Sequence, residues 1–125
     1  MGTPAPRRRV LIVDDEEAMR LWLAKIVQQD IDAEVTLAGT CEAALRFARE
    51  NAYDAILLDL MMPGIGGREL LKRIRSDSAS GSAPVIVVSV LANAPETKAL
   101  GANAVLSKPV DRDALVAALR ARLGA

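Results

Sequence analysis

Short apolar runs alternate along this chain with longer segments in which apolar residues recur every three or four positions. The short runs predict β-strands at residues 10–13, 34–38, 55–60, 85–90 and 104–107. The longer patterns predict amphipathic helices at residues 16–29, 42–50, 68–75 and 111–123, with one short helical turn after the fourth strand. This alternation predicts an α/β fold in which helices cover both faces of a parallel sheet.

The polarity of the predicted strands indicates their order in the sheet. Strands that are buried on both faces are apolar throughout, whereas edge strands carry more polar residues. The first, third and fourth strands are the apolar ones, while the second (EVTLA) is mixed and the fifth (AVLS) is short. The pattern therefore predicts the order 2-1-3-4-5 and a flavodoxin-like three-layer αβα sandwich. A ligand crevice is expected at the carboxyl ends of strands one and three, where the chain reverses direction across the sheet.

The length and composition fit one domain with its own core, because the chain has 125 residues and 51% of them are hydrophobic. Residues 1–8 are expected to be a disordered leader or an added tail, and residues 9–123 the folded domain. The chain ends just after its last predicted helix. We therefore expect either a stand-alone domain or one excised from a larger regulator.

The charge balance argues against nucleic acid or a membrane as a partner. Sixteen basic residues match sixteen acidic ones, and the short run Arg7–Arg9 is typical of a solubilising tail. No stretch approaches the roughly twenty apolar residues of a membrane span. Cys41 is the only cysteine and cannot form an internal disulfide. These features favour a cytoplasmic protein.

Acidic residues follow two of the predicted central strands. Asp14 and Asp15 come directly after the first strand, and Asp59 lies at the end of the third. The predicted topology brings these carboxylates to one crevice, where a hard divalent cation would compensate their charge. Mg²⁺ is the natural candidate. The alternative is that Asp14 and Asp15 only cap the first helix, which is common for Asp at such a position.

Two further strand ends add to this cluster. Lys108 follows the fifth strand and supplies a cation that could meet a phosphoryl oxygen, and Ser89 adds a hydroxyl at the end of the fourth strand. Four strand ends would thus contribute to one site, which favours the functional interpretation over helix capping.

The segments VLIVDDEE, ILLDLMMPGIGGREL, PVIVVS and LSKPVD resemble the motif blocks of response-regulator receiver domains. The resemblance spans residues 10–123. It implies that Asp59 is the phosphoacceptor. It also implies that Mg²⁺, or Mn²⁺, is bound directly by Asp15, by Asp59 and by the backbone carbonyl of Met61, and through a water molecule by Asp14. It also implies that Ser89 and Lys108 contact the phosphoryl group, and that Pro109 is the cis-proline of the family.

The sequence departs from the usual receiver pattern in three places. Val105 occupies the position of the usual switch aromatic, and the segment between Pro95 and Gly101 leaves room only for a shortened fourth helix. This compact form is similar to some receivers attached to hybrid histidine kinases, and it predicts a monomer or a weak dimer. Met61 and Leu91 stand where relatives often carry polar residues that help water hydrolyse the acyl phosphate, so slow hydrolysis is expected.

The resemblance implies a signalling domain rather than an enzyme, with at most self-catalysed phosphotransfer and autodephosphorylation. Its phosphodonor would be a sensor histidine kinase or a histidine phosphotransfer protein, and phosphorylation would switch binding to a downstream partner that the sequence does not identify. Two alternatives stay open. One is a receiver-like module that docks a partner without phosphorylation. The other is a haloacid-dehalogenase-like phosphatase, which the sequence disfavours because that signature has two aspartates two apart on the first strand.

Overall fold

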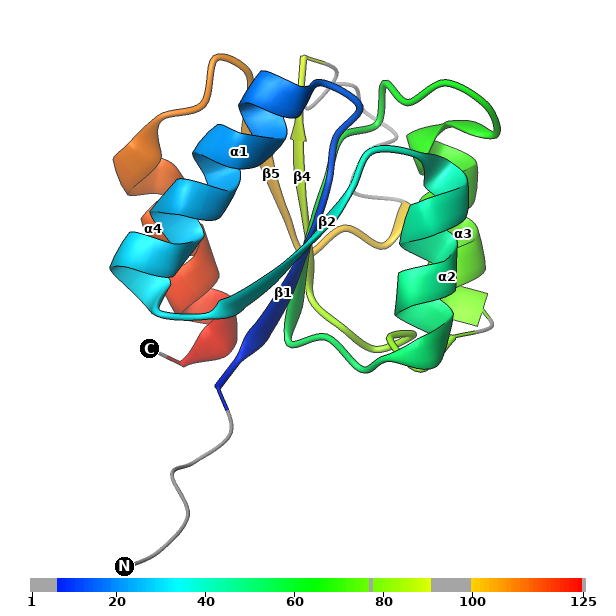
Figure 1. The fold of residues 1–125 in the computed structure, drawn as a ribbon, viewed down its shortest axis with the longest axis horizontal. Helices are drawn as coiled ribbons and strands as arrows, with labels where there is room; N and C mark the ends of the chain where they lie inside the picture. The colour runs from blue at the N-terminus through cyan, green and yellow to red at the C-terminus, as the bar shows by residue number, and fades with distance from the viewer. Residues whose placement is uncertain (1–6, 77, 91–99, 125) are drawn as a thin grey trace, which may run out of the picture.

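The computed structural model describes residues 7–76, 78–90 and 100–124. Strands and helices alternate through most of this length (Figure 1). The strands are β1 (Arg9–Val13), β2 (Glu34–Ala38), β3 (Ala55–Leu58), β4 (Val85–Ser89) and β5 (Ala104–Ser107). The helices are α1 (Glu17–Ile26), the π-helix η1 (Val27–Ile31), α2 (Cys41–Glu50), α3 (Gly66–Ser76) and α4 (Arg112–Leu123).

All five strands join one parallel sheet in the order β2-β1-β3-β4-β5, so the predicted order is confirmed. The central strands β1, β3 and β4 are buried almost throughout, whereas β2 and β5 are partly exposed. This difference in burial is the one that the strand polarity predicted.

Helices cover both faces of the sheet, with α1 and α4 on one face and α2 and α3 on the other (Figure 1). Alternate residues of each central strand face opposite sides. In β1, for example, Leu11 and Val13 pack in the cluster under α2 and α3, while Val10 and Ile12 pack in the cluster under α1 and α4. The three layers of the predicted sandwich are therefore confirmed.

The helix ends show where local sequence is informative and where it is not. Thr40 and Asp111 are the N-cap residues of α2 and α4, and each side chain accepts a hydrogen bond from the backbone amide three residues on. The predicted helix at 16–29 is corrected, because α1 gives way to η1, which is followed by Asp32 in a left-handed conformation. The predicted short helix before Gly101 falls largely in residues 91–99, outside the described part of the chain, as do residues 1–6 of the predicted leader.

None of the helices in the described residues combines the length and hydropathy that crossing a lipid bilayer requires.

Candidate functional site

The chemistry-bearing residues predicted from the sequence lie at one edge of the sheet. Asp14 follows β1, Asp59 follows the last residue of β3, Ser89 ends β4, and Lys108 follows β5. Because the strands are parallel, all four positions fall at the carboxyl edge, where ligand sites of open α/β sheets form. The predicted convergence of four strand ends is therefore present in the fold.

Lys108 joins two of the acidic residues. Its Nζ donates to Asp14 Oδ2 and to Asp59 Oδ2, at 2.8 Å in both cases. The lysine side chain is only 14% exposed, and the two aspartate side chains are 2% and 7% exposed. The ammonium group therefore compensates two largely buried carboxylates.

The second oxygen of each of these carboxylates is held by nearby backbone. Asp14 Oδ1 accepts from the Glu16 amide and Asp59 Oδ1 from the Met61 amide, both at 2.9 Å. Glu16, and not Asp14 or Asp15, is the N-cap residue of α1, and its side chain forms no capping hydrogen bond. The alternative that the aspartates only cap the helix is therefore wrong.

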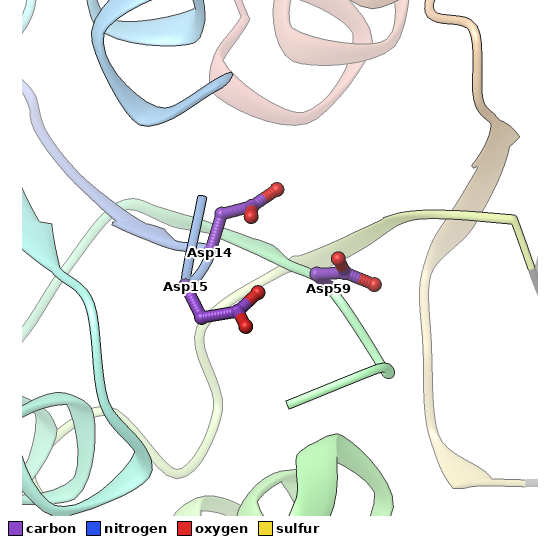
Figure 2. Close-up of side chains that lie close together, drawn as sticks. All are labelled: Asp14, Asp15 and Asp59. Carbon is purple, nitrogen blue, oxygen red and sulfur yellow. The ribbon is translucent and has the colours of Figure 1, made fainter. Parts of the chain in front are cut away.

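Asp15 completes an acidic cluster. Asp14, Asp15 and Asp59 each offer one oxygen, and these atoms lie within 4.8 Å of one another. Figure 2 shows the three side chains close together, with Asp14 and Asp15 on the segment after β1 and Asp59 at the end of β3. Asp14 and Asp59 are buried and Asp15 is exposed, so the cluster opens to solvent on one side. Several hard oxygen ligands beside an open side fit Mg²⁺, which keeps part of its water shell in proteins.

The surroundings of Lys108 keep it charged. Burial alone would lower the pKa of its ammonium group, but the hydrogen bonds and negative charges of Asp14 and Asp59 outweigh burial and raise that pKa above its ordinary value. Lys108 is thus positively charged at neutral pH.

The remaining predicted positions are Pro109, Ser89, Met61, Val105 and Leu91. The Lys108–Pro109 peptide bond is cis. Ser89 is fully buried, and its carbonyl accepts from the Lys108 amide. Met61 has an exposed side chain, and Val105 packs against the core cluster under α2 and α3. Leu91 lies outside the described residues.

Two contacts escaped sequence reasoning. Arg20 of α1 donates from Nη1 to the backbone carbonyl of Asp14 at 2.9 Å. Gly67 of α3 lies so close to the segment after β3 that a Cβ there would overlap the Asp59 carbonyl oxygen and the backbone of Leu60. The spacing of Gly67 from Asp59 could have suggested a close approach, but a bond to a backbone carbonyl leaves no mark in the sequence.

A family model described as the response regulator receiver domain matches residues 10–120. The chain belongs to this family. The receiver domain is 40% identical over 104 residues to the response regulator receiver protein Anae109_2439 of Anaeromyxobacter, which covers 82% of this chain and 43% of that protein. It is 36% identical over 107 residues to the sensory/regulatory protein RpfC of Xanthomonas campestris, which covers 82% of this chain and 15% of that protein. The chain thus spans less than half the length of these two relatives.

Solved receiver structures have the same fold. The chemotaxis protein CheY4 of Vibrio cholerae superposes with a TM-score of 0.84 at 30% identity, covering 94% of this chain and 99% of that one. The receiver domain of the sensor histidine kinase PA1611 of Pseudomonas aeruginosa gives a TM-score of 0.85 at 26% identity, covering 97% and 100%. Relatives thus include both response regulators and sensor kinases. The receiver domain is a phosphoacceptor module of two-component signalling, not a classical enzyme.

Proposed function

We propose that this receiver domain accepts a phosphoryl group on the carboxylate of Asp59 and that the reaction depends on Mg²⁺ or Mn²⁺. One observation carries the proposal. Asp59 Oδ2 lies 2.8 Å from Lys108 Nζ, and Asp14 and Asp15 offer oxygens within 4.8 Å of Asp59. A nucleophilic carboxylate beside a fixed cation and a cation-binding cluster has the parts that phosphoryl transfer requires.

The family resemblance suggests roles for the other residues. Asp14, Asp15, Asp59 and the backbone carbonyl of Met61 would hold the divalent ion, which supplies charge neutralisation for phosphoryl oxygens when it is bound. The receiver of PA1611 is described with magnesium coordinated in its active site cleft, which supports this assignment.

Lys108 and Ser89 would contact the phosphoryl group once it is in place. Lys108 already lies against the acceptor oxygen, and Ser89 ends the neighbouring strand β4. A charged donor and a hydroxyl donor that reach the same phosphoryl group would stabilise its negative charge.

The donor would be a phosphohistidine of a sensor histidine kinase or of a histidine phosphotransfer protein in the cytoplasm. One Asp59 oxygen forms a bond to phosphorus while the phosphorus–nitrogen bond of the donor breaks. The imidazole leaves with that electron pair, and an acyl phosphate remains. Relatives that are described as sensor proteins or sensor kinases support this class of partner.

The output would be a change in partner binding. A phosphoryl group on Asp59 adds charge beside Lys108 and Ser89, and shifts in these contacts would bias the segment that follows β4. Autodephosphorylation by water would reset the switch, with no small-molecule product besides phosphate. We propose that the domain works as a monomer or a weak dimer, of the type attached to hybrid kinases.

Intact-mass analysis after incubation with acetyl phosphate and Mg²⁺ tests the proposal. We expect the parent protein to gain the mass of one phosphoryl group. Asp59→Asn should gain none, because an amide is a very poor nucleophile, and the parent protein should gain none when EDTA replaces Mg²⁺. Asp54→Asn is the matched control, because Asp54 lies at the opposite end of β3, where it accepts from the Arg9 amide.

Two outcomes would contradict the proposal in different ways. Absence of labelling by acetyl phosphate and by a phosphorylated histidine kinase would favour the phosphorylation-independent docking module. Steady hydrolysis of small phosphate esters without a lasting phosphoprotein would favour the phosphatase alternative.

A further inference from the structure

Arg20 reaches back from the first turn of α1 to the segment that carries the acidic cluster. Its Nη1 donates to the Asp14 carbonyl oxygen at 2.9 Å. Side chains on a helix lean toward its N-terminus, so an arginine at this position is directed toward the loop before the helix. A hydrogen bond from a charged donor is stronger than one between neutral groups.

This contact completes the fixation of Asp14. The Asp14 amide donates to the Ala38 carbonyl at 3.2 Å, so the backbone of Asp14 is held on one side by β2 and on the other by Arg20. Its carboxylate meets Glu16 and Lys108. The carboxylate is therefore placed by its own two contacts and by two bonds that hold the Asp14 backbone, and Arg20 supplies one of the backbone bonds.

Gly39 provides the room for the guanidinium group. A Cβ built on Gly39 would lie 2.8 Å from Arg20 Nη1 and 3.1 Å from its Cζ. The backbone of Gly39 does not have a positive φ, unlike that of Gly64 or Gly66, so a side chain here would affect the space beside Arg20 and not the backbone conformation. An alanine at this position would displace the end of the Arg20 side chain without straining its own backbone.

We propose that Arg20 is a positioning residue for the divalent-cation site, acting through the Asp14 carbonyl, and that Gly39 is the second half of this device. The inference rests on the proposed function, because it concerns the cation that the acidic cluster would bind. Groups that orient metal ligands without touching the ion typically contribute about 10–100-fold to metal affinity.

The charge of Arg20 predicts the opposite effect, which makes the proposal testable. A cation near the cluster repels Mg²⁺, so an arginine that acted only through its charge would weaken binding, and its neutralisation would tighten it. If Arg20 positions Asp14, neutralisation loosens binding.

Calorimetric titration of the full chain with MgCl₂ separates these cases. For Arg20→Met we expect about a tenfold rise in the dissociation constant. Gly39→Ala alters no charge, and it is expected to raise the dissociation constant for Mg²⁺ several fold. The double variant is expected to match Arg20→Met, because Gly39→Ala has no contact left to disturb. Lys25→Met is the matched control, since Lys25 is exposed on the same helix, and its affinity is expected to stay within about twofold of the parent protein.

Urea unfolding in EDTA reports whether each variant is folded. If Arg20→Met does not fold, the Mg²⁺ affinities of Gly39→Ala and Arg20→Lys test the inference instead. Arg20→Lys keeps the charge but not the length or planar geometry of the guanidinium group. Tighter binding in Arg20→Met, unchanged binding in the folded variants, or additive losses in the double variant would overturn the inference. If the parent protein is labelled on Asp59 and binds Mg²⁺, these results refute only the role of Arg20. A parent protein that binds no Mg²⁺ would refute both this role and the proposed function.

Discussion

Replacing Lys108 by Met should make the stability of the folded protein depend more strongly on divalent cations. Lys108 Nζ compensates the carboxylates of Asp14 and Asp59, at 2.8 Å from each. Methionine keeps much of the side-chain length and removes the charge. Without the ammonium group, three clustered carboxylates repel one another, and the folded state has lost the cation that offsets this repulsion.

The cost can be bounded from burial. Removing one partner of a fully buried ion pair costs about 3–5 kcal/mol, whereas exposed pairs contribute about 0–1 kcal/mol. The Lys108 side chain is 14% exposed and Asp15 is accessible to water, so the pair lies between these limits. We expect Lys108→Met to lower the free energy of unfolding in EDTA by about 2–3 kcal/mol.

Mg²⁺ should restore most of this loss. A ligand at about 100 times its dissociation constant stabilises the folded state by about 2.7 kcal/mol. Removing the lysine also removes a cation that opposes Mg²⁺, so the variant should bind Mg²⁺ at least about tenfold more tightly, equivalent to about 1.4 kcal/mol of additional stabilisation.

Urea unfolding with EDTA or with excess MgCl₂ measures both effects. Lys72→Met is the control, because Lys72 is exposed on α3. The reasoning is refuted if Lys108→Met is as stable as the parent protein in EDTA, or if Mg²⁺ stabilises the two proteins equally.

Three further predictions follow from single positions. Gly67→Ala should destabilise the fold by about 2–4 kcal/mol in urea unfolding and slow labelling of Asp59, because its Cβ would collide with the Leu60 backbone; a variant that unfolds and labels like the parent protein would contradict this. Cys41 should react with iodoacetamide at pH 8 at least about tenfold more slowly in the folded than in the urea-unfolded chain. Burial raises the pKa of the Cys41 thiol, and the negative charge of Asp15 raises it further by a smaller amount. Equal rates in the two states would refute this prediction. Met61→Asn should shorten the lifetime of the phosphorylated protein several fold, followed by intact mass, because an amide at this exposed position can orient water and a thioether cannot; a longer lifetime would oppose that explanation.

The sheet was predictable because burial on both faces imposes a visible pattern. The apolar runs that form β1, β3 and β4 contrast with the mixed run in β2, and this contrast is enough to separate central strands from an edge strand. The end of the first helix was not predictable in the same way. The chain turns at Asp32, where φ is 58°, with no glycine or proline to mark the turn. Asp can adopt this conformation, but it does so too rarely for its presence to be a signal.

The candidate site was likewise only partly predictable from the sequence. Membership in the cluster could be predicted, because residues that directly follow parallel strands meet at one edge. The pairing within it could not, since either oxygen of any of the three aspartates could have received Lys108. Arg20 contacts the Asp14 carbonyl, and Gly67 approaches the backbone of Asp59 and Leu60. Both contacts depend on distances between a helix and the sheet edge, which packing determines and residue identity does not.

The register of buried strands is what fixes the spacing of the acidic cluster. Val13 pairs with Leu58 in the ladder between β1 and β3, and the Asp59 amide donates to the Val13 carbonyl at 3.0 Å. Asp14 and Asp59 are the next residues along these strands, so their separation is inherited from the apolar pair before them. A slip of one residue would exchange the β3 side chains between the two faces of the sheet. Both faces are packed against helices, and this packing opposes the exchange. Burial of the apolar strands thus holds together carboxylates that would otherwise repel one another, and it does so before any cation binds.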